Sequence, residues 1–438
     1  MNPLIPLPPI LLIILQIVFW IPVAALFHSY VFYPLMLKWL AGGRRNNQLI
    51  HTAEDTAAEW PYLVAAMAAH NEESVIEATL SSLFASDYPA DRLEVLIAAD
   101  NCSDRTVEII QRFQTNHPNL LLRVLSGRNG KIRSLNLTLG ENRERLAARG
   151  DYVLILCDAN VRWSRELPRE LVKHFRNPRI GQVASNVLDG RGEHAGIADQ
   201  EEAYVNRENA IKYHEGVLWG RMMGAFGACF AMRGHLFAPV PENFRSDDFT
   251  HTMRCFEQGF DAIVEPAAIA WEDVSEDIKV EFGRKKRISL GNFQNLRLFW
   301  RFLLPWRAGW ATWFAFWSHK GIRWFGPFLI LAALLSSAML AAFHWIYALA
   351  LAGQLCLIAG AVADAALSRQ GIHLRPLRYA HYFLLMNVAL AVGAWRFIAG
   401  EKQAFWEPAK RVLADQPTLA EGPVPPAVTD ATGSLEDS

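Results

Sequence analysis

Hydrophobic and polar residues alternate differently in the middle of the chain and at its two ends. In residues 61–298, short apolar runs that suit buried strands are separated by stretches with amphipathic spacing, and these runs lie at 62–69, 93–100, 120–125 and 151–158. Alternation of this kind is typical of an α/β domain with a mostly parallel sheet. We therefore predict four strands at these runs, with helices between them.

Near both ends, the apolar runs are long and almost uncharged. Residues 1–41 hold the first run, which lacks the basic start and small-residue cleavage site of a signal peptide and therefore predicts a membrane-spanning helix. Residues 325–347 and 348–367 predict a helical hairpin of two further spans. Basic residues follow the first run directly, so the positive-inside rule predicts that the domain after it is cytoplasmic.

Two further segments bear on the membrane. Residues 379–399 form a fourth apolar run with basic residues on both sides, and we favour a re-entrant or interfacial helix over a full crossing. Residues 299–324 mix six tryptophans with arginine and lysine, which favours an amphipathic helix on the membrane surface over a buried tryptophan-rich helix. We therefore expect a multi-pass protein of the inner (plasma) membrane.

The predicted domain organisation follows from these patterns. Its units are an N-terminal transmembrane helix (1–41), a linker (42–60), a cytoplasmic α/β domain (61–298), an amphipathic interfacial helix (299–324), a C-terminal transmembrane region (325–399), a cytoplasmic tail motif (400–413) and a disordered tail (414–438).

Composition narrows the classes of function. The formal net charge of -1 gives no indication of a nucleic-acid partner. The five cysteines form no CxxC pair and show no zinc-site spacing, so neither a disulfide framework nor a structural zinc site is predicted. Hydrophobic residues make up 52% of the chain, and their excess at the two ends agrees with a lipid membrane as a partner.

Polar side chains follow three of the four predicted strands, and they are His70, Asn71 and Glu72, then Asp100, then Asp158 and Asn160. The carboxyl ends of parallel strands meet at one edge of a sheet, where open α/β sheets bind ligands. Asp158 is a hard oxygen ligand there, suited to Mg²⁺ or Mn²⁺ carrying a diphosphate. The alternative is that Asp158 only caps the next helix. Lys131 follows a glycine-punctuated loop and could reach phosphate oxygens, but the loop lacks the Walker spacing.

Taken with motifs further along, these residues resemble glycosyltransferase family 2, whose domains have the GT-A fold of nucleotide-diphospho-sugar transferases. The motifs that carry the resemblance are His70-Asn71-Glu72, Asp100-Asn101-Cys102-Ser103-Asp104, Gly130-Lys131, Asp158-Ala159-Asn160, KYHEG (212–216), GAFGACFAMR (224–233), SDDF (246–249), RKKRISLGNFQ (284–294), SHKGIRW (318–324) and KQAFWEPAKR (402–411). The resemblance implies an inverting hexosyltransferase. It would move a sugar from a nucleotide sugar, most readily a UDP-sugar, to a saccharide or lipid-linked acceptor in cell-surface or exopolysaccharide synthesis.

The resemblance also implies roles on the donor side. Asp100 would bind the nucleotide base, with Asn71 and Glu72 near the uridine. Asp158 would hold the metal ion, while Asn160 stands where the family has a second aspartate and removes one charge. Lys131 and Arg287 would contact the diphosphate. The alternative for the basic run 284–287 is a structural contact with lipid headgroups.

On the acceptor side, the resemblance implies that Asp248 is the general base and that Asp247 lies beside it. Gly227 would let the acceptor approach the backbone, and Trp406 would belong to a lid, with a packing glycine and an interfacial anchor as the respective alternatives. Residues 284–288 lack the glutamine and tryptophan of processive relatives, so polymerisation and single transfer both stay open.

Two other classes of function are alternatives to this one. A non-catalytic, degenerate transferase subunit of a membrane polysaccharide assembly complex is motivated by the departures at Asn160 and at 284–288. A nucleotidyltransferase would need a glycine- and arginine-rich loop after the first strand, which residues 70–73 do not supply. Export or polymerisation subunits are possible partners of the leading candidate.

Overall fold

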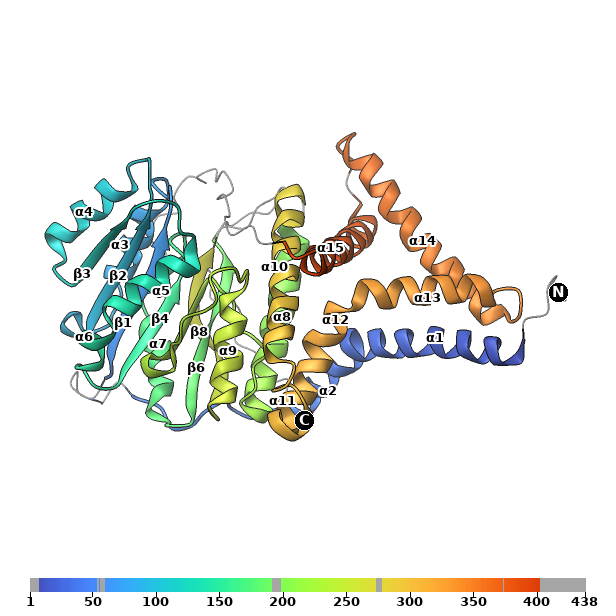
Figure 1. Cartoon of the computed structure of the whole chain (residues 1–438), viewed down its shortest axis with the longest axis horizontal. Helices are drawn as coiled ribbons and strands as arrows, with labels where there is room; N and C mark the ends of the chain where they lie inside the picture. The colour runs from blue at the N-terminus through green and yellow to red at the C-terminus, as the bar shows by residue number, and fades with distance from the viewer. Residues whose placement is uncertain are drawn as a thin grey trace, which may run out of the picture.

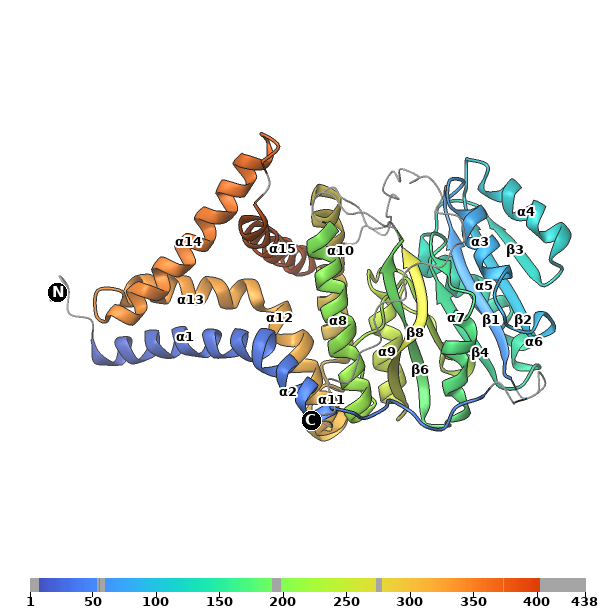
Figure 2. The same ribbon diagram turned by 180° about the vertical axis from the view of Figure 1, so that it is seen from behind.

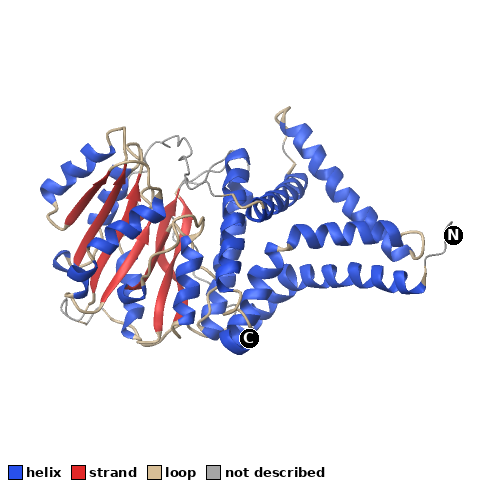
Figure 3. Cartoon of the chain, viewed as in Figure 1, coloured by secondary structure: helices blue, strands red, loops and turns tan. Residues whose placement is uncertain are grey.

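The computed structural model describes residues 8–52, 55, 60–190, 198–272, 278–372 and 374–401. An α/β unit occupies one side of the molecule, and long helices project from the other (Figure 1). Figure 3 shows that all strands belong to the α/β unit and that the projecting part is helical.

The described residues form one eight-stranded sheet with the strand order β3-β2-β1-β4-β7-β6-β8-β5. The strands are β1 (Tyr62–Ala69), β2 (Leu93–Asp100), β3 (Leu120–Leu125), β4 (Tyr152–Cys157), β5 (Arg162–Trp163), β6 (Ile180–Asp189), β7 (Cys229–Arg233) and β8 (Asp261–Glu272). The first four confirm the strands predicted from the apolar runs. The predicted α/β class is confirmed as well, and the sheet is mixed.

Strands β1 to β4 are parallel to one another, whereas β7 is antiparallel to both β4 and β6. Because of this reversal, the carboxyl end of β4 lies beside the amino end of β7, and Cys157 pairs with Cys229. The segment that precedes β7 therefore reaches the same sheet edge as the polar residues that follow β1, β2 and β4.

Helices cover both faces of the sheet, as the two large clusters of buried side chains show. The helices are α3 (Ile76–Phe84), α4 (Thr106–Asn116), α5 (Lys131–Glu141), α6 (Arg143–Ala147), α7 (Leu167–Val172) and α9 (Asp247–Glu257). Residues of α3, α4 and α7 pack in one cluster, and residues of α5, α6 and α9 pack in the other. Alternate residues of β1, such as Leu63 and Val64, enter opposite clusters, as expected of a strand buried on both faces.

Helices α8 (Ala198–Trp219) and α10 (Ile278–Phe299) stand between the sheet and the projecting helices (Figure 2). The N-terminal segment forms α1 (Pro9–Phe27), a π-helical turn (His28–Phe32) and α2 (Tyr33–Ala41), and it is long and apolar enough to cross a membrane. So are α14 (Trp345–Ser368) and α15 (Arg375–Ile398). The part of the chain described thus holds three candidate spans.

A fourth candidate is a bent pair of helical segments. Residues Pro305–Trp324 comprise α11 (Pro305–Ala315), a π-helical turn (Phe316–Gly321) and α12 (Ile322–Trp324), and they meet α13 (Gly326–Leu340) at 64°. Together the two parts pass the length and hydropathy test for one span.

Two predicted boundaries differ from the structure. Residues 299–324 do not form one helix, because Phe299 ends α10, α11 begins at Pro305, and Gly309 has φ of 75° inside α11. The hairpin turn lies at 341–344 rather than at 347–348, since the side chain of His344 accepts a hydrogen bond from the backbone N–H of Ile346 and caps α14.

Helix α15 packs closely along α10, and a glycine makes this possible. A Cβ added to Gly393 would lie 2.4 Å from Cβ of Ser289 and 2.6 Å from the backbone oxygen of Lys286. In contrast, a Cβ added to Gly353 in α14 would meet nothing within 4 Å.

We predict that Gly393→Ala destabilises the protein, because the added methyl group forces α15 away from α10. Overpacking typically costs about 1–3 kcal/mol. The matched variant Gly353→Ala should leave stability unchanged or raise it, since alanine favours a helix interior over glycine by roughly 0.5–1 kcal/mol. Thermal unfolding of the two purified variants in the same detergent measures both effects, and a Gly393→Ala protein as stable as wild type would contradict the packing described.

Candidate active site

The turns after β1 and β2 bind each other at the sheet edge. His70 Nδ1 lies 2.6 Å from the backbone oxygen of Asp100, and the side-chain oxygen of Asn71 accepts a hydrogen bond from the N–H of Ser103 (2.8 Å). Asn71 and Asn101 both have left-handed φ, 53° and 52°, which asparagine tolerates better than most residues. These turns displace the start of α3 from residue 70 to Ile76.

Glu72 and Asp100 are both buried, in contrast to Asn71, which is exposed. The backbone N–H of Glu72 donates to the hydroxyl of Thr106 at 2.8 Å, which connects the first turn to the start of α4. The structure thus brings the three residues predicted to surround the nucleotide base to one edge. Their role in binding it stays a prediction.

The carboxylate of Asp100 binds the glycine-punctuated loop that leads into α5. It accepts hydrogen bonds from the backbone N–H groups of Asn129 (2.8 Å) and Gly130 (2.7 Å) and pairs with the guanidinium of Arg128. Burial alone would raise the pKa of Asp100, but these hydrogen bonds outweigh it and lower the pKa. Asp100 therefore shapes the loop that places Lys131 at the first position of α5.

Lys131 is the centre of a charged cluster. Its ammonium lies 2.6 Å from Asp158 Oδ1 and 3.8 Å from Asp247 Oδ2, and it donates to the backbone oxygen of Gly227 at 3.3 Å. Burial would lower the pKa of Lys131, but the two carboxylates outweigh it and raise the pKa. One cation at the start of α5 thus joins the end of β4, the segment before β7 and the start of α9.

The two aspartates at the start of α9 have different environments. Burial raises the pKa of Asp247, but Lys131 outweighs it and lowers the pKa. The pKa of Asp248 is raised by burial and by the neighbouring charge of Asp247. Paired carboxyl groups whose pKa values are pushed apart are typical of sites that use one of them as acid or base.

Asp248 is held in place from two sides. Its Oδ1 accepts hydrogen bonds from the hydroxyl of Ser246 (2.5 Å) and the N–H of Phe249 (2.8 Å). A Cβ on Gly227 would lie 3.2 Å from Asp248 Oδ2, so only glycine leaves this oxygen uncrowded. Gly227 thus lies beside Asp248, and its role towards an acceptor stays a prediction.

Helix α10 brings Arg287 to the same cluster. Burial and Arg284 lower the pKa of Arg287, whereas Asp158 and the aspartates of α9 oppose this shift. Lys285, in contrast, is directed away from solvent, with its ammonium 3.1 Å from Glu201 and 3.2 Å from Glu281. Contact with lipid headgroups was one interpretation of this basic run, and it is wrong for Lys285 because both carboxylates are buried.

The residues present fit a divalent ion that arrives with a substrate phosphate. Among the described residues, no three His, Cys, Asp or Glu side chains are grouped closely enough to hold a metal ion. Asp158 retains about a third of its side-chain exposure, and Asn160 is buried two residues later. Mg²⁺ in proteins is commonly bound through one or two carboxylates plus substrate phosphates, which this donor set could provide.

Some predicted residues are not placed, and others were missed. Trp406 lies outside the described residues. Lys212 and Glu215 belong to the KYHEG motif and had no predicted role, yet both are buried near this site. With Glu208 they are spaced by four and three residues, which places three charged side chains on one face of α8. That spacing was the available signal.

The fold and the site together define a class, and family models identify it. A model described as glycosyl transferase family 2 matches residues 65–238, and a model described as glycosyl transferase family group 2 matches residues 153–363. The two cover more than half of the chain between them. The chain belongs to glycosyltransferase family 2.

Two curated relatives are each 28% identical to part of this chain. A β-monoglucosyldiacylglycerol synthase of a Synechocystis species is 28% identical over 271 residues, which cover 59% of this chain and 53% of that protein. A poly-β-1,6-N-acetyl-D-glucosamine synthase of Staphylococcus epidermidis is 28% identical over 173 residues, 37% of this chain and 39% of that protein. The chain therefore spans about half or less of the curated relatives it matches.

A solved structure shares the fold. The mannosyltransferase PcManGT of Pyrobaculum calidifontis, solved in complex with GDP-Man and Mn²⁺, has a TM-score of 0.60 and 19% sequence identity. The match covers 88% of this chain and 99% of that one, and it supports the GT-A fold assignment.

We predict that Asp100→Asn lowers the free energy of unfolding at pH 7 by about 1.5–3 kcal/mol, the usual contribution of hydrogen bonds to a charged group. Because the pKa of Asp100 is lowered in the folded state, its ionised form stabilises the protein above the unfolded pKa, about 3.9, and this stabilisation is lost as the pH falls through the folded pKa. The deficit of the variant should shrink below pH ~4.

Unfolding measured against pH for wild type and Asp100→Asn checks this prediction. Asp91→Asn, at an exposed aspartate just before β2, serves as the control and should match wild type. An Asp100→Asn protein with wild-type stability at pH 7 would show that the carboxylate does not hold the loop.

Proposed function

We propose that the protein is an inverting glycosyltransferase that transfers a sugar from a UDP-linked donor to a saccharide or lipid-linked acceptor at the membrane surface. The observation that carries the proposal is the pair Asp247 and Asp248 beside Lys131. One carboxylate is held ionised by the lysine, and the other has a raised pKa and lies next to the glycine that leaves space for an acceptor.

In the proposed reaction, Asp248 accepts the proton of the acceptor hydroxyl as that oxygen forms a bond to the anomeric carbon. The bond from this carbon to the diphosphate breaks at the opposite face, and the electron pair leaves with the diphosphate, so the anomeric configuration inverts. The cations of Lys131 and Arg287 lie on the donor side, where they would counter the charge of the leaving group.

A divalent ion fits the donor side of this scheme. Asp158 and Asn160 would hold Mg²⁺ or Mn²⁺, and a bound ion supplies electrostatic stabilisation of the departing diphosphate. Since Asn160 contributes an amide oxygen in place of a carboxylate, Asp158 supplies the only charged ligand of this pair. We therefore propose that the ion is bound weakly by the free protein and more tightly with the nucleotide.

The helices suggest how the domain meets the membrane. In Figure 2, α8 and α10 run across the direction of α1 and α13, and α15 is seen nearly end-on. If α1 and α13 cross a bilayer, α15 would lie along its surface, as proposed for an interfacial helix. Trp306 and Trp310 are 75% and 67% exposed, which suits a position among headgroups. We propose that the α/β domain lies on the cytoplasmic side of the inner membrane.

The activity is tested by nucleotide release from purified membranes across a panel of UDP- and GDP-sugars. We expect release with a UDP-sugar and a loss of about 10²–10⁴-fold in Asp248→Asn, the usual contribution of a positioned base. Asp151→Asn, at an exposed aspartate next to the opposite end of β4, should retain wild-type release. No release from any donor would favour the degenerate-subunit alternative, and wild-type release by Asp248→Asn would refute the assignment of the base.

The pH dependence of release gives an independent check on Asp248. The base acts only when deprotonated, and its pKa is raised by burial and by Asp247. The acidic limb of the rate profile should therefore have its midpoint above pH ~4, the value of an ordinary aspartate. A rate that stays constant down to pH ~4 would contradict the role of Asp248.

Metal binding can be measured without turnover, through the electron paramagnetic resonance signal of Mn²⁺ titrated in the presence of UDP. We expect Asp158→Asn to weaken Mn²⁺ binding by roughly tenfold or more and Asn160→Asp to strengthen it, because each changes the charge of the donor set by one. Asp151→Asn again serves as the control. Equal Mn²⁺ affinity in all four proteins would exclude this pair of residues as the metal site.

A further inference from the structure

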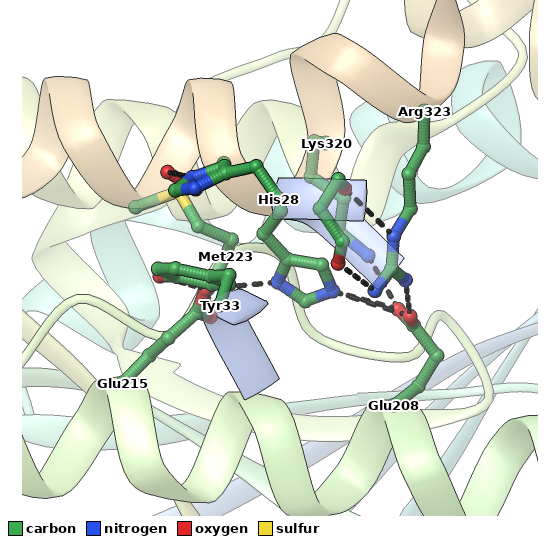
Figure 4. A network of polar contacts seen from close by, with 10 residues as sticks. His28, Tyr33, Glu208, Glu215, Met223, Lys320 and Arg323 are labelled. Atoms are coloured by element: carbon green, nitrogen blue, oxygen red, sulfur yellow. Dashed lines mark hydrogen bonds and ion pairs between the residues drawn. The ribbon is translucent and has the colours of Figure 1, made fainter. Parts of the chain in front are cut away.

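A second polar cluster lies between α8 and two candidate membrane spans (Figure 4). These are Pro9–Ala41 and the bent pair of Pro305–Trp324 and Gly326–Leu340, which we call the membrane-facing segments. At its centre is His319, a fully buried residue in the π-helical turn Phe316–Gly321. Its Nδ1 lies 2.9 Å from Glu215 Oε1, and its Nε2 lies 3.1 Å from Glu208 Oε2. Both glutamates are on α8 and are also buried. The imidazole ring thus connects two carboxylates that lie on the same face of α8.

Glu208 is surrounded by positive charge. The ammonium of Lys320 lies 2.6 Å from its Oε2, and the guanidinium of Arg323 pairs with its Oε1. Burial would raise the pKa of Glu208, but Lys320, His319 and Arg323 outweigh it and hold the pKa well below its usual range. Arg323 also donates to the backbone oxygen of Ser29 at 3.2 Å, in the π-helical turn of the N-terminal segment.

Glu215 binds two elements at once. Its Oε1 accepts a hydrogen bond from the phenol of Tyr33 (2.9 Å), the first residue of α2, in addition to its contact with His319. Its Oε2 accepts from the backbone N–H of Met223 (3.0 Å). One oxygen therefore faces side chains from the membrane-facing segments, and the other faces the chain that leads to β7.

Met223 begins a segment, residues 223–228, that we call the acceptor segment. Gly227, near its end, gives its backbone oxygen to Lys131 and leaves room for Asp248. Its Phe226 ring lies 3.4 Å from the ammonium of Lys212, one turn before Glu215 on α8. Helix α8 thus holds the acceptor segment at two points, through a hydrogen bond at its start and a cation–π contact near its end.

The environment of Lys212 supports this arrangement. Lys212 is buried, and no ion pair joins its ammonium to any residue that the structure describes, whereas the centre of the Phe226 ring lies 3.4 Å from it. Burial and Lys320 lower the pKa of Lys212 to about 7, while the carboxylates of Glu208 and Asp248 oppose the shift. The lysine of α8 is therefore electrostatically coupled to both the polar cluster and the proposed base.

We propose that Glu215 is a positioning residue that fixes the acceptor segment beside Asp248, and that its orientation is set by the membrane-facing segments through His319 and Tyr33. This proposal deepens the proposed function, on which its catalytic consequence rests. Its structural part, the dependence of the acceptor segment on Glu215, does not require that the protein has transferase activity.

Physical grounds favour this role over simple packing. Buried charges contribute little net stability compared with apolar side chains of similar volume, but they need particular partners in one geometry. A carboxylate with one oxygen on each side of an interface therefore specifies the arrangement of both sides. The two π-helical turns, at His28–Phe32 and Phe316–Gly321, lie at this same contact, and such turns are frequent at functional sites.

The direct test is amide hydrogen exchange of the acceptor segment in the purified full chain in detergent or nanodiscs. Glu215→Gln keeps the shape of the side chain but removes the charge that orders its two oxygens. We expect exchange in residues 223–228 to accelerate by roughly tenfold or more, the effect of losing a hydrogen bond to a charged group. Glu108→Gln, at an exposed glutamate on α4, is the matched control and should not change it.

Two variants distinguish the contacts of Glu215 from those of Glu208. His319→Gln, which removes a contact of Glu215, should also accelerate exchange in the acceptor segment. Lys320→Met, which removes a contact of Glu208 alone, should leave exchange there near the wild-type rate. Equal exchange in Glu215→Gln and wild type would overturn the proposal, and so would acceleration in Lys320→Met equal to that in Glu215→Gln.

If Glu215→Gln does not fold, Tyr33→Phe takes its place, because it removes one hydrogen bond to the same carboxylate. Unchanged exchange in that variant would then overturn the proposal.

A kinetic arm tests the consequence for catalysis. With a donor identified from the panel of nucleotide sugars, Glu215→Gln should raise the acceptor KM or lower kcat for transfer while the donor KM stays unchanged. Faster exchange with wild-type transfer kinetics would show that the segment is held by Glu215 but does not position the acceptor, and would overturn the proposed role. If no donor supports turnover, the proposed function fails, and the exchange experiment still decides whether Glu215 holds the segment.

Discussion

The arrangement of the site depends on the ammonium of Lys131. Four segments of the chain meet at this cation. Lys131 itself begins α5, and Asp158 after β4, Asp247 of α9 and the backbone oxygen of Gly227 before β7 all lie within 4 Å of its ammonium. The carboxylates would repel one another without it. The mixed sheet makes the meeting possible, since the parallel strands bring Asp158 to the edge and the antiparallel β7 brings Gly227 to the same place.

From this cation, the structure extends outwards in two directions. Towards the sheet, Asp100 binds the loop 128–130 and so fixes where Lys131 begins its helix. Towards the candidate membrane spans, the chain continues back from Gly227 to Met223, whose N–H donates a hydrogen bond to Glu215 of α8. The second direction ends on residues that come from both membrane-facing segments, Tyr33 and His319. The charged cluster and the buried polar cluster are therefore joined by one short stretch of backbone.

Sequence reasoning succeeded where local pattern decides the structure. The apolar runs predicted β1 to β4, and parallel topology then placed the residues after them at one edge. It was less successful where distant partners decide. The contact between Lys131 and Asp247 needs the reversal at β7, and the burial of Lys285 needs Glu201 and Glu281, neither of which a local pattern reveals. The turn at 341–344 depends on one histidine cap within a uniformly apolar run.

The replacement of the second aspartate by Asn160 agrees with this electrostatic arrangement. Asp158 and the two aspartates of α9 act on the pKa of Arg287, and Lys131 contacts Asp158 and Asp247, so these three carboxylates share the cations of the cluster. A carboxylate in place of Asn160 would add a further negative charge in a buried position two residues from Asp158. In the proposed function, the amide would still offer an oxygen to a metal ion without adding the charge. If a metal ion binds as proposed, the amide would hold it more weakly than a carboxylate would, and burial together with Asp247 already raises the pKa of Asp248 in the same cluster.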